Sequence, residues 1–459
     1  MNDGAKPPAE AGPRSTRERL GAVLGRKAEA LSPWVLRRTL RELQHIIDPT
    51  VSEVEGGRRA AGVAGWYARA TPEQRRDCWL LMSEQFAPDP AAIHAAREAY
   101  ESALGTDDEA QAEVHLRRAI MAPRTRLLQR FAAFPEGVRF LVDMRAELLP
   151  QLRSNKRLAA LDAELQELFS TWFDVGFLEL QRISWDSPAS LVEKLIKYEA
   201  VHDIRGWADA KNRLDEDRRC YGFFHPRLPG EPLIFVEVAL LQELAGSIPP
   251  LLDEEAEAAD LRKATTAIFY SISNTQRGLR GVSFGDSLIK RVVETLHAEF
   301  PQLKTFATLS PIPGFRAWLG KHAEALLAAL PARTRTALAR ELAPAELSAP
   351  ALLAALDGVA GVNEKSLLAR WLLGAAARYL ALEQDEGGRP LDAVARFHLG
   401  NGARVERLNW LADPSPKGLR QSHGVMVNYL YDLKRLDKHR AQFAQGKVPM
   451  ASAIQSLLD

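Results

Sequence analysis

Glycines and basic residues crowd together in one short stretch of this sequence, and that combination is typical of a turn that binds an anion. The members of this group are Gly278, Gly281, Gly285, Arg277, Arg280, Lys290 and Arg291. Glycine lets a phosphate come close to the backbone, and the first amides of a helix carry partial positive charge because they have no partner inside the helix. The same residues also suit a plain strand-to-helix turn with a solvated basic face, so the pattern alone leaves both interpretations open.

The segments on either side of this turn are predicted to be a strand and a helix. Residues 267–273 form a short apolar and aromatic run, which is typical of a buried strand. Over residues 288–296 apolar side chains recur three and four positions apart, which predicts a helix with Gly285–Asp286 near its first turn. Residues 305–309 predict a second short strand, and the turn SPIPGF, which starts at Ser310, follows it directly.

The overall composition argues against several classes of function. Lysine plus arginine (60) nearly equals aspartate plus glutamate (59), so no excess of positive charge indicates binding to nucleic acid or to an acidic membrane. The chain has 459 residues, which is more than one compact core usually holds, so we expect two domains. No uninterrupted apolar run reaches the ~18 residues that a membrane-spanning helix needs.

The cysteine content and the N-terminal residues predict a cytoplasmic protein. Cys78 and Cys220 are too few for a disulfide framework or a zinc site, and each has the apolar neighbours of an inert buried thiol. This usage suits a reducing compartment. Residues 1–32 are rich in proline, glycine and charge and lack the apolar core of a secretory signal, so we expect a disordered tail. The acidic residues in that tail argue against an organelle transit peptide.

The rest of the chain divides by pattern into a helical part and a part that contains strands. Residues 33–185 carry successive apolar stripes at helical spacing and predict a bundle-like domain, whose role we expect to be scaffolding and contact between subunits. Residues 186–459 mix strand-like runs with helices and predict an α+β catalytic domain with a mixed sheet. An alanine- and leucine-rich stretch, about 320–384, interrupts them and predicts a helical insertion.

Short apolar runs place the other predicted strands of residues 186–459. These runs are 220–224, 233–238, 394–399, 405–410 and 424–430. The loop HPRLPGE, with two prolines and a glycine, predicts a hairpin between the first two strands, and residues 240–252 predict a short helix. By spacing alone, Ser310 before a proline is typical of a turn, and a lone His398 at the end of a strand is typical of a structural residue.

Several blocks of the sequence resemble the malonyl-CoA decarboxylase family, and they occur in order over most of residues 190–435. The blocks are IFYSIS (268–273), RGLRGVSFGDSLIKRVV (277–293), TLSPIPGFRAWL (308–319), FHLGNGARVERLNWLAD (397–413), GVMVNYLYDL (424–433) and RRCYGFFHPRLPGEPL (218–233). The resemblance implies that the all-helical domain is followed by a catalytic domain with an acetyltransferase-like (GNAT-like) fold.

In acetyltransferase-like folds, an Arg/Gln-x-x-Gly-x-Gly/Ala turn between a strand and a helix binds the pyrophosphate of coenzyme A. The equivalent stretch here has Ser283 in place of the middle glycine. The resemblance implies that the substrate-binding residues of this turn are Arg280, Gly281, Val282, Ser283, Phe284, Gly285 and Asp286, with the amides from about Gly281 to Asp286 against the pyrophosphate. Several family members carry a glutamate where this chain has Ser283, so this chain lacks that carboxylate.

The catalytic pair of the family is a serine in the SPIPGF block and a histidine in the FHL block, and both are present as Ser310 and His398. The resemblance implies that Ser310 binds the malonyl carboxylate and that His398 protonates the enolate left by loss of CO2. An unperturbed histidine pKa of ~6.5 suits that role. Tyr431 is expected to contact the site and to orient His398. Because the thioester itself accepts the electrons, we expect neither a cofactor nor a metal.

The resemblance therefore predicts a malonyl-CoA decarboxylase that converts malonyl-CoA to acetyl-CoA and CO2, has no nucleic-acid or membrane partner, and forms a homotetramer. An acyl-CoA-dependent acyltransferase with the same turn is the alternative, and it would require an acceptor amine. A catalytically silent scaffold that binds coenzyme A is a third hypothesis, against which the presence of both Ser310 and His398 argues.

Overall fold

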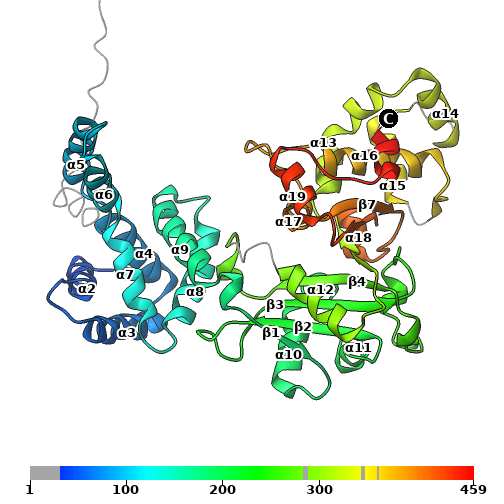
Figure 1. The fold of residues 1–459 in the computed structure, drawn as a ribbon. Helices are drawn as coiled ribbons and strands as arrows, with labels where there is room; N and C mark the ends of the chain where they lie inside the picture. The colour runs from blue at the N-terminus through cyan, green and yellow to red at the C-terminus, as the bar shows by residue number, and fades with distance from the viewer. Residues whose placement is uncertain (1–30, 283–287, 343–346, 359–360, 459) are drawn as a thin grey trace, which may run out of the picture. The chain divides into compact units, whose positions relative to one another are not determined.

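A computed structural model describes residues 31–282, 288–342, 347–358 and 361–458 of the chain. By its internal contacts the chain separates into two compact units. The helical unit contains the residues up to Phe177, the loop Pro226–Pro229 and the turn that starts at Gln276. The sheet unit contains the rest, and Figure 1 shows its strands together with the helices that pack on them.

The helical unit is built from helices alone over most of its length. They are α2 (Pro33–Ile46), α3 (Glu53–Arg69), α4 (Pro72–Gln85), α5 (Pro90–Ala103), α6 (Glu109–Ile120), α7 (Pro123–Ala132), α8 (Gly137–Leu148) and α9 (Ala159–Trp172). Proline occupies the first turn of α2, α4, α5 and α7, where its missing N–H costs no helical hydrogen bond. Three aromatic rings from α3, α7 and α8 join in the core, because Phe140 stacks on Phe131 at 5.3 Å and meets Tyr67 edge-on at 5.2 Å.

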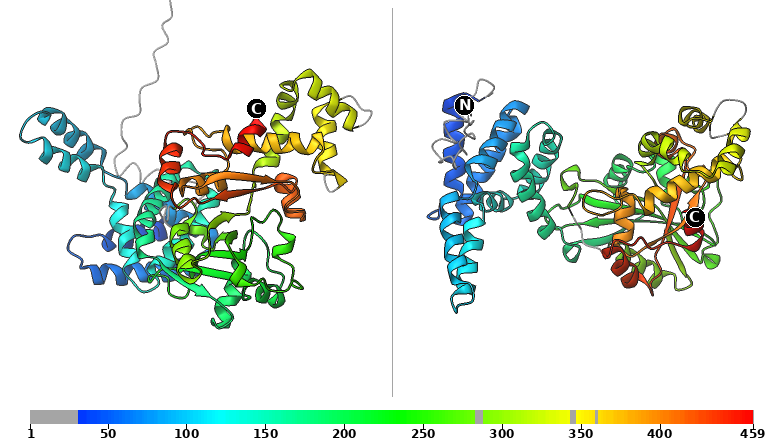
Figure 2. Two further views of the ribbon diagram at one scale, coloured as in Figure 1. Left: turned by 45° about the vertical axis from the view of Figure 1, so that its right-hand side comes forward. Right: turned by 90° about the horizontal axis from the view of Figure 1, so that it is seen from above.

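The antiparallel pair α5 and α6 projects from the other helices of its unit, as both views in Figure 2 show. None of the residues of α5 is buried, and Ala112 is the one buried residue of α6. The pair therefore contributes little to the core of the helical unit in a single chain.

The sheet unit holds one mixed sheet. Its described strands are β1 (Glu179–Ile183), β2 (Arg218–Phe224), β3 (Pro232–Leu241), β4 (Thr266–Asn274), β5 (Thr305–Thr308), β6 (Ser310–Pro311), β7 (Arg404–Asn409) and β8 (Met426–Leu430). The order is β1-β2-β3-β4-β5-β8-β6, and β7 pairs with β8. The pair β4–β5 is parallel and the other pairs are antiparallel. The predicted α+β class with a mixed sheet, after a helical region, is confirmed.

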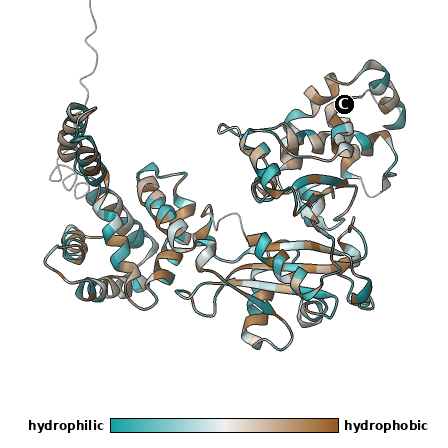
Figure 3. Ribbon diagram, in the orientation of Figure 1, coloured by the Kyte–Doolittle hydropathy of each residue, from teal (hydrophilic) through white to brown (hydrophobic). Residues whose placement is uncertain are grey.

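Helices cover both faces of the first strands of the sheet. The described helices of this unit are α10 (Ala189–Tyr198), α11 (Trp207–Arg213), α12 (Leu288–Glu299), α13 (Phe315–Ala328), α14 (Ala332–Leu342), α15 (Ala349–Asp357), α16 (Leu367–Ala381), α17 (Ala393–Gly400), α18 (Pro416–Ser422), α19 (Leu436–Ala444) and α20 (Ser452–Leu458). Residues of α10 and α11 pack on Cys220 and Phe235. The preceding residue of β2, Arg219, faces the other way, toward α12, where it pairs with Glu299. The apolar runs of β2 and β3 show as brown stretches in Figure 3.

The parallel ladder between β4 and β5 is short, so β4 is paired with β5 over only part of its length. It runs only from the pair Thr266 and Thr305 to the pair Phe269 and Thr308. A β-bulge next to Glu237 shifts the register of the neighbouring ladder at the same level, and bulges bend the strand that carries them. The last residues of β4 therefore extend beyond the end of β5.

Two of the predicted elements are wrong. Residues 394–399 were predicted as a strand but form α17, because Asp392 caps a helix there: its carboxylate accepts the N–H of Ala395 at 2.8 Å. Residues 240–252 were predicted as a helix, but β3 continues to Leu241 and only a single short turn, Pro249–Leu251, follows. The strands predicted at 220–224, 233–238, 305–309, 405–410 and 424–430 and the helix at 288–296 are confirmed within one or two residues at most ends. Among the described residues, no helix has the length and apolar character needed to cross a membrane.

Candidate functional site

Ser310 and His398 are 88 residues apart in the chain and are in hydrogen-bond contact. Ser310 Oγ and His398 Nε2 lie 3.1 Å apart, and both residues are buried. Ser310 begins β6, whose pairing with β8 places it opposite Val427. His398 lies in the last turn of α17. The fold thus brings together the two residues that the family resemblance assigned to the chemistry.

Both ends of α17 are anchored, which fixes the position of His398. At its start the buried Asp392 caps the helix, and burial raises the pKa of this carboxyl to about 6. At its end the carbonyl of His398 accepts the N–H of Ala403 at 3.1 Å, where the chain turns into β7. The helix that carries His398 is therefore held at both ends.

Two tyrosines from β8 and the residue after it hold the imidazole. Tyr431 Oη lies 2.7 Å from His398 Nδ1. The ring of Tyr429 stacks on the imidazole, with 4.6 Å between centroids and 26° between planes. Because side chains alternate along a strand, Tyr429 and Tyr431 lie on the same side of β8. The predicted contact of Tyr431 with His398 is therefore present in the structure, whereas Tyr429 was not singled out from the sequence, although this alternation in NYLY could have found it.

Burial sets the protonation of these groups. It lowers the pKa of His398 to about 3, so the imidazole of the free protein is neutral at neutral pH. Burial also raises the pKa of the Tyr431 phenol, which therefore keeps its proton. The site is a chain of neutral hydrogen-bonding groups that can pass a proton but carries no charge of its own. The histidine differs from the sequence-based expectation, which assumed an unperturbed pKa.

Thr308 is a further member of the site that sequence reasoning missed. It is fully buried at the end of β5, and its hydroxyl accepts the Ser310 O–H at 2.8 Å and the backbone N–H of Tyr429 at 3.2 Å. The signal in the sequence was its spacing of two from Ser310, which puts both side chains on one face of extended backbone.

The described part of the predicted phosphate turn, Arg280 to Val282, packs within the helical unit. Arg145 of α8 donates to the carbonyls of Gly278 and Arg280 at 2.8 and 2.9 Å. Gln166 of α9 donates to the carbonyl of Gly281 at 3.1 Å. The carbonyls of the turn are thus held by side chains of two helices.

Glycine is required at two points of this turn for different reasons. A Cβ on Gly278 would lie 1.9 Å from the carbonyl oxygen of Val142 in α8, so this glycine permits close packing of two backbones. Gly281 has a φ of +80°, in the left-handed region that favours glycine. The N–H of Val282 donates to the carbonyl of Leu279 at 3.0 Å, so this amide bonds within the turn.

The remaining residues predicted to bind substrate, Ser283, Phe284, Gly285 and Asp286, lie outside the described residues. Of the predicted set, Arg280 and Gly281 are exposed and Val282 is buried. The structure thus brings Ser310, His398 and Tyr431 into one cluster. It also shows that the first part of the glycine turn is held by close packing and hydrogen bonds within the helical unit.

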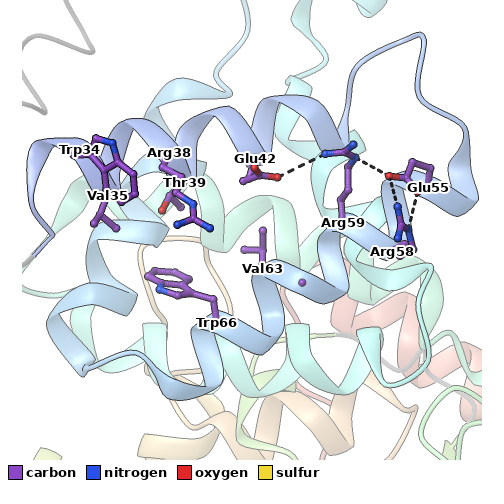
Figure 4. Close-up of a pocket in the computed structure, with 11 residues that line it drawn as sticks. Trp34, Val35, Arg38, Thr39, Glu42, Glu55, Arg58, Arg59, Val63 and Trp66 are labelled. Carbon is purple, nitrogen blue, oxygen red and sulfur yellow. Dashed lines mark hydrogen bonds and ion pairs between the residues drawn. The ribbon is translucent and has the colours of Figure 1, made fainter.

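Two surface hollows are described, and neither is lined by Ser310 or His398. One, of about 620 Å³, lies between α2 and α3 and has Trp34 and Trp66 near one end, with an ion-pair network around Arg59 at the other (Figure 4). The other, of about 590 Å³, lies between α12 and the strands β1 and β2. The candidate site is therefore recognised by its side-chain chemistry and not by the size of a hollow.

Comparisons with known proteins point to one family. A family model described as the malonyl-CoA decarboxylase C-terminal domain matches residues 176–459, which is more than half of the chain. A second model, described as the malonyl-CoA decarboxylase N-terminal domain, matches residues 86–173. The two models thus meet close to Phe177, where the helical unit gives way to the sheet unit.

Individual proteins of known structure or sequence are similar over nearly the whole chain. A crystal structure of malonyl-CoA decarboxylase from Rhodopseudomonas palustris is 42% identical and aligns with a TM-score of 0.80, covering 92% of this chain and 99% of that one. A crystal structure of malonyl-CoA decarboxylase from Agrobacterium vitis is 40% identical and aligns with a TM-score of 0.81, covering 92% and 100%. The mitochondrial malonyl-CoA decarboxylase of Mus musculus is 34% identical over 470 residues, which cover 97% of this chain and 93% of that protein.

Proposed function

Because the chain belongs to the malonyl-CoA decarboxylase family, we propose that it converts malonyl-CoA to acetyl-CoA and CO2 with Ser310 and His398 as its catalytic residues. The observation that carries this assignment of residues is the buried contact of the serine hydroxyl with an imidazole that Tyr431 holds from its other side.

The reaction needs few groups. When CO2 leaves the malonyl group, the electron pair of the broken C–C bond moves into the thioester and forms an enolate. Hydrogen-bond donors preorganised around the enolate oxygen lower the barrier, by roughly 2.7–4 kcal/mol for each donor in well-studied cases. Carbon 2 must then take up a proton. Overall the malonyl anion and one proton become acetyl-CoA and CO2, so each turnover consumes a proton.

The low pKa of His398 means that the imidazole is protonated only when a substrate carboxylate lies beside it. In the free protein the imidazole is neutral because it is buried. A malonyl carboxylate bound beside it favours the imidazolium, since an opposite charge raises a histidine pKa. When that carboxylate leaves as neutral CO2, the imidazolium loses its counter-ion in a buried site and becomes a strong acid. The proton on Nε2 then passes to carbon 2, and the imidazole returns to its neutral form.

The other predicted residues have supporting roles. Ser310 donates its hydroxyl to the malonyl carboxylate, which holds that group out of the plane of the thioester so that the breaking bond overlaps the developing enolate. Tyr431 keeps the imidazole in place, and a phenol oxygen can serve either protonation state because it both donates and accepts. Residues Arg280 to Asp286 bind the phosphates of coenzyme A, chiefly through backbone amides.

The deciding experiment is turnover with malonyl-CoA as the sole substrate. The purified protein should release acetyl-CoA and CO2 in equal amounts, as followed by chromatography of the CoA esters and by trapping of CO2. His398→Asn prepared in the same way is the matched control for contaminating activity. A strict requirement for an acceptor amine would instead indicate an acyltransferase, and binding of malonyl-CoA without any turnover would indicate a silent scaffold.

We also propose that the protein is a cytoplasmic homotetramer whose helical unit makes contacts between subunits. Exposed apolar residues of the helical unit, such as Leu104, Ile120 and Met121 at the ends of α5 and α6, support the second part. Both cysteines are free and buried, which suits a reducing compartment. Light scattering coupled to size exclusion tests the tetramer. Cell fractionation tests the location, and recovery in mitochondria, as the name of the mouse relative says of that protein, would contradict it.

A further inference from the structure

Thr308 occupies a position from which it can control the catalytic serine. It ends β5, Ser310 begins β6, and Leu309 between them points into the apolar core. Thr308 and Ser310 therefore face the same way, and their hydroxyl oxygens lie 2.8 Å apart. Thr308 has no measurable exposure, so solvent does not compete for its hydroxyl.

The hydroxyl of Thr308 is held in place from the backbone. Its oxygen accepts the N–H of Tyr429, the residue whose ring stacks on His398, and the carbonyl of Thr308 accepts the side-chain amide of Asn428 at 2.7 Å. Asn428 in turn is bonded to Asn409 at 2.8 Å. The threonine thus lies on a fixed frame made by β5, β7 and β8, and its hydroxyl cannot turn away without leaving a buried N–H unpaired.

The hydrogen bond from Ser310 to Thr308 determines which nitrogen of the neutral His398 carries the hydrogen. Ser310 has a single hydroxyl hydrogen, and in the structure it is directed at Thr308. Ser310 can then meet His398 Nε2 only as an acceptor, so Nε2 must carry the hydrogen of the neutral imidazole. Nδ1 is left as an acceptor, which matches the Tyr431 phenol that lies 2.7 Å from it and keeps its proton. The hydrogen bonds run in one direction, from Tyr431 through His398 and Ser310 to Thr308.

We propose that Thr308 is a positioning residue: by accepting the Ser310 hydroxyl it fixes the hydrogen of the resting His398 on Nε2, the nitrogen that faces the serine. Without this acceptor the Ser310 hydrogen is free to point at Nε2, and the imidazole can then take the other tautomer, with its hydrogen on Nδ1. The imidazolium that donates to carbon 2 can then form only after the Ser310 hydrogen turns away from Nε2. The tautomer of a neutral histidine is set by such neighbouring bonds. The consequence for turnover rests on the proposed decarboxylation, whereas the tautomer itself does not.

The test uses the full-length protein with Thr308→Val, which keeps the shape of the side chain and removes its hydroxyl, and with Thr308→Ser, which restores the hydroxyl. Thr266→Val, a buried threonine at the start of β4, is the control for placing valine in this sheet. The first measurement is the ¹⁵N spectrum of ring-labelled histidine in the ligand-free protein, where His398→Asn identifies the His398 signals by their loss. The second is kcat and KM with malonyl-CoA.

Wild type, Thr308→Ser and Thr266→Val should show an Nε2–H tautomer, and Thr308→Val should shift the His398 signals toward the Nδ1–H form. Thr308→Val should lower kcat about tenfold with KM changed less than about twofold, as expected when one hydrogen bond close to the reacting group is lost. Unaltered His398 signals in Thr308→Val would overturn the proposal, and so would equal losses of kcat in the serine and valine variants. If wild type itself releases no acetyl-CoA, the proposed function fails, while the spectra still decide the role of Thr308.

Discussion

The bond between Tyr431 and His398 offers a quantitative test of the site. In Tyr431→Phe the ring remains, but Nδ1 of the buried imidazole loses the hydroxyl that lies 2.7 Å away. Loss of the partner of a buried polar group costs about 1–3 kcal/mol. If the imidazolium formed during turnover bears this cost, kcat should fall about 5-fold to 150-fold, since each 1.36 kcal/mol is a factor of about ten in rate. KM should change much less, because the phenol is not expected to contact the coenzyme A portion of the substrate.

Tyr429→Phe is the matched control for this variant. The ring of Tyr429 also packs on His398, but its hydroxyl is buried with no hydrogen-bond partner among the described residues. Its removal should leave kcat within about twofold of wild type, because no bond to the imidazole is lost. Initial rates of acetyl-CoA release over a range of malonyl-CoA concentrations give kcat and KM for both variants. A Tyr431→Phe enzyme as fast as wild type, or equal losses in the two variants, would refute the reasoning.

Other consequences of the structure can be measured in the same preparations. His398→Asn and Ser310→Ala should each reduce kcat by at least about 100-fold. Binding of a malonyl-CoA analogue that cannot lose CO2, measured by calorimetry, should change much less, and near-normal turnover in either variant would remove that residue from the mechanism. Folded His398 has a pKa of about 3 and its unfolded form ~6.5, so the unfolded chain binds the extra proton between these values and stability must fall on acidification. The Tm of His398→Gln should therefore drop less from about pH 7 to about pH 4.5 than that of wild type or of exposed His94→Gln, and parallel curves would contradict this. Gly278→Ala should destabilise the protein by about 1–3 kcal/mol because its Cβ meets the Val142 carbonyl, whereas Gly62→Ala, with open space around it, should be neutral or slightly stabilising in denaturant unfolding.

The strands that the sequence predicted well are those with a strong local signal. The run before Phe224 and the run after Pro232 are almost entirely buried, and the intervening prolines and glycine mark the hairpin, so local composition was sufficient. Strand β1 was not predicted because it is an edge strand, and its residues Glu179–Ile183 are mostly exposed and polar. Edge strands of this kind bury too little to show an apolar pattern.

The site itself depended on information that the local pattern lacks. The segment 394–399 has the apolar content of a strand, and only the cap supplied by Asp392 distinguishes it as a helix. The meeting of Ser310 with His398 depends on the pairing of β6 with β8 and on α17, which are contacts between distant parts of the chain that no spacing rule predicts. The lowered pKa of His398 follows from burial, which is likewise known only from the fold.

Hydrogen bonds from two side chains of the helical unit limit how this protein can be shortened. Arg145 and Gln166 donate to the backbone carbonyls of Gly278, Arg280 and Gly281. A fragment that starts at residue 178 retains Ser310, His398 and the whole sheet. It lacks Arg145 and Gln166 because it lacks α8 and α9. Such a truncation would keep Ser310 and His398 but would remove the side chains that bond the backbone carbonyls of this turn. A shortened protein that is to keep this turn in its observed conformation must therefore also contain α8 and α9.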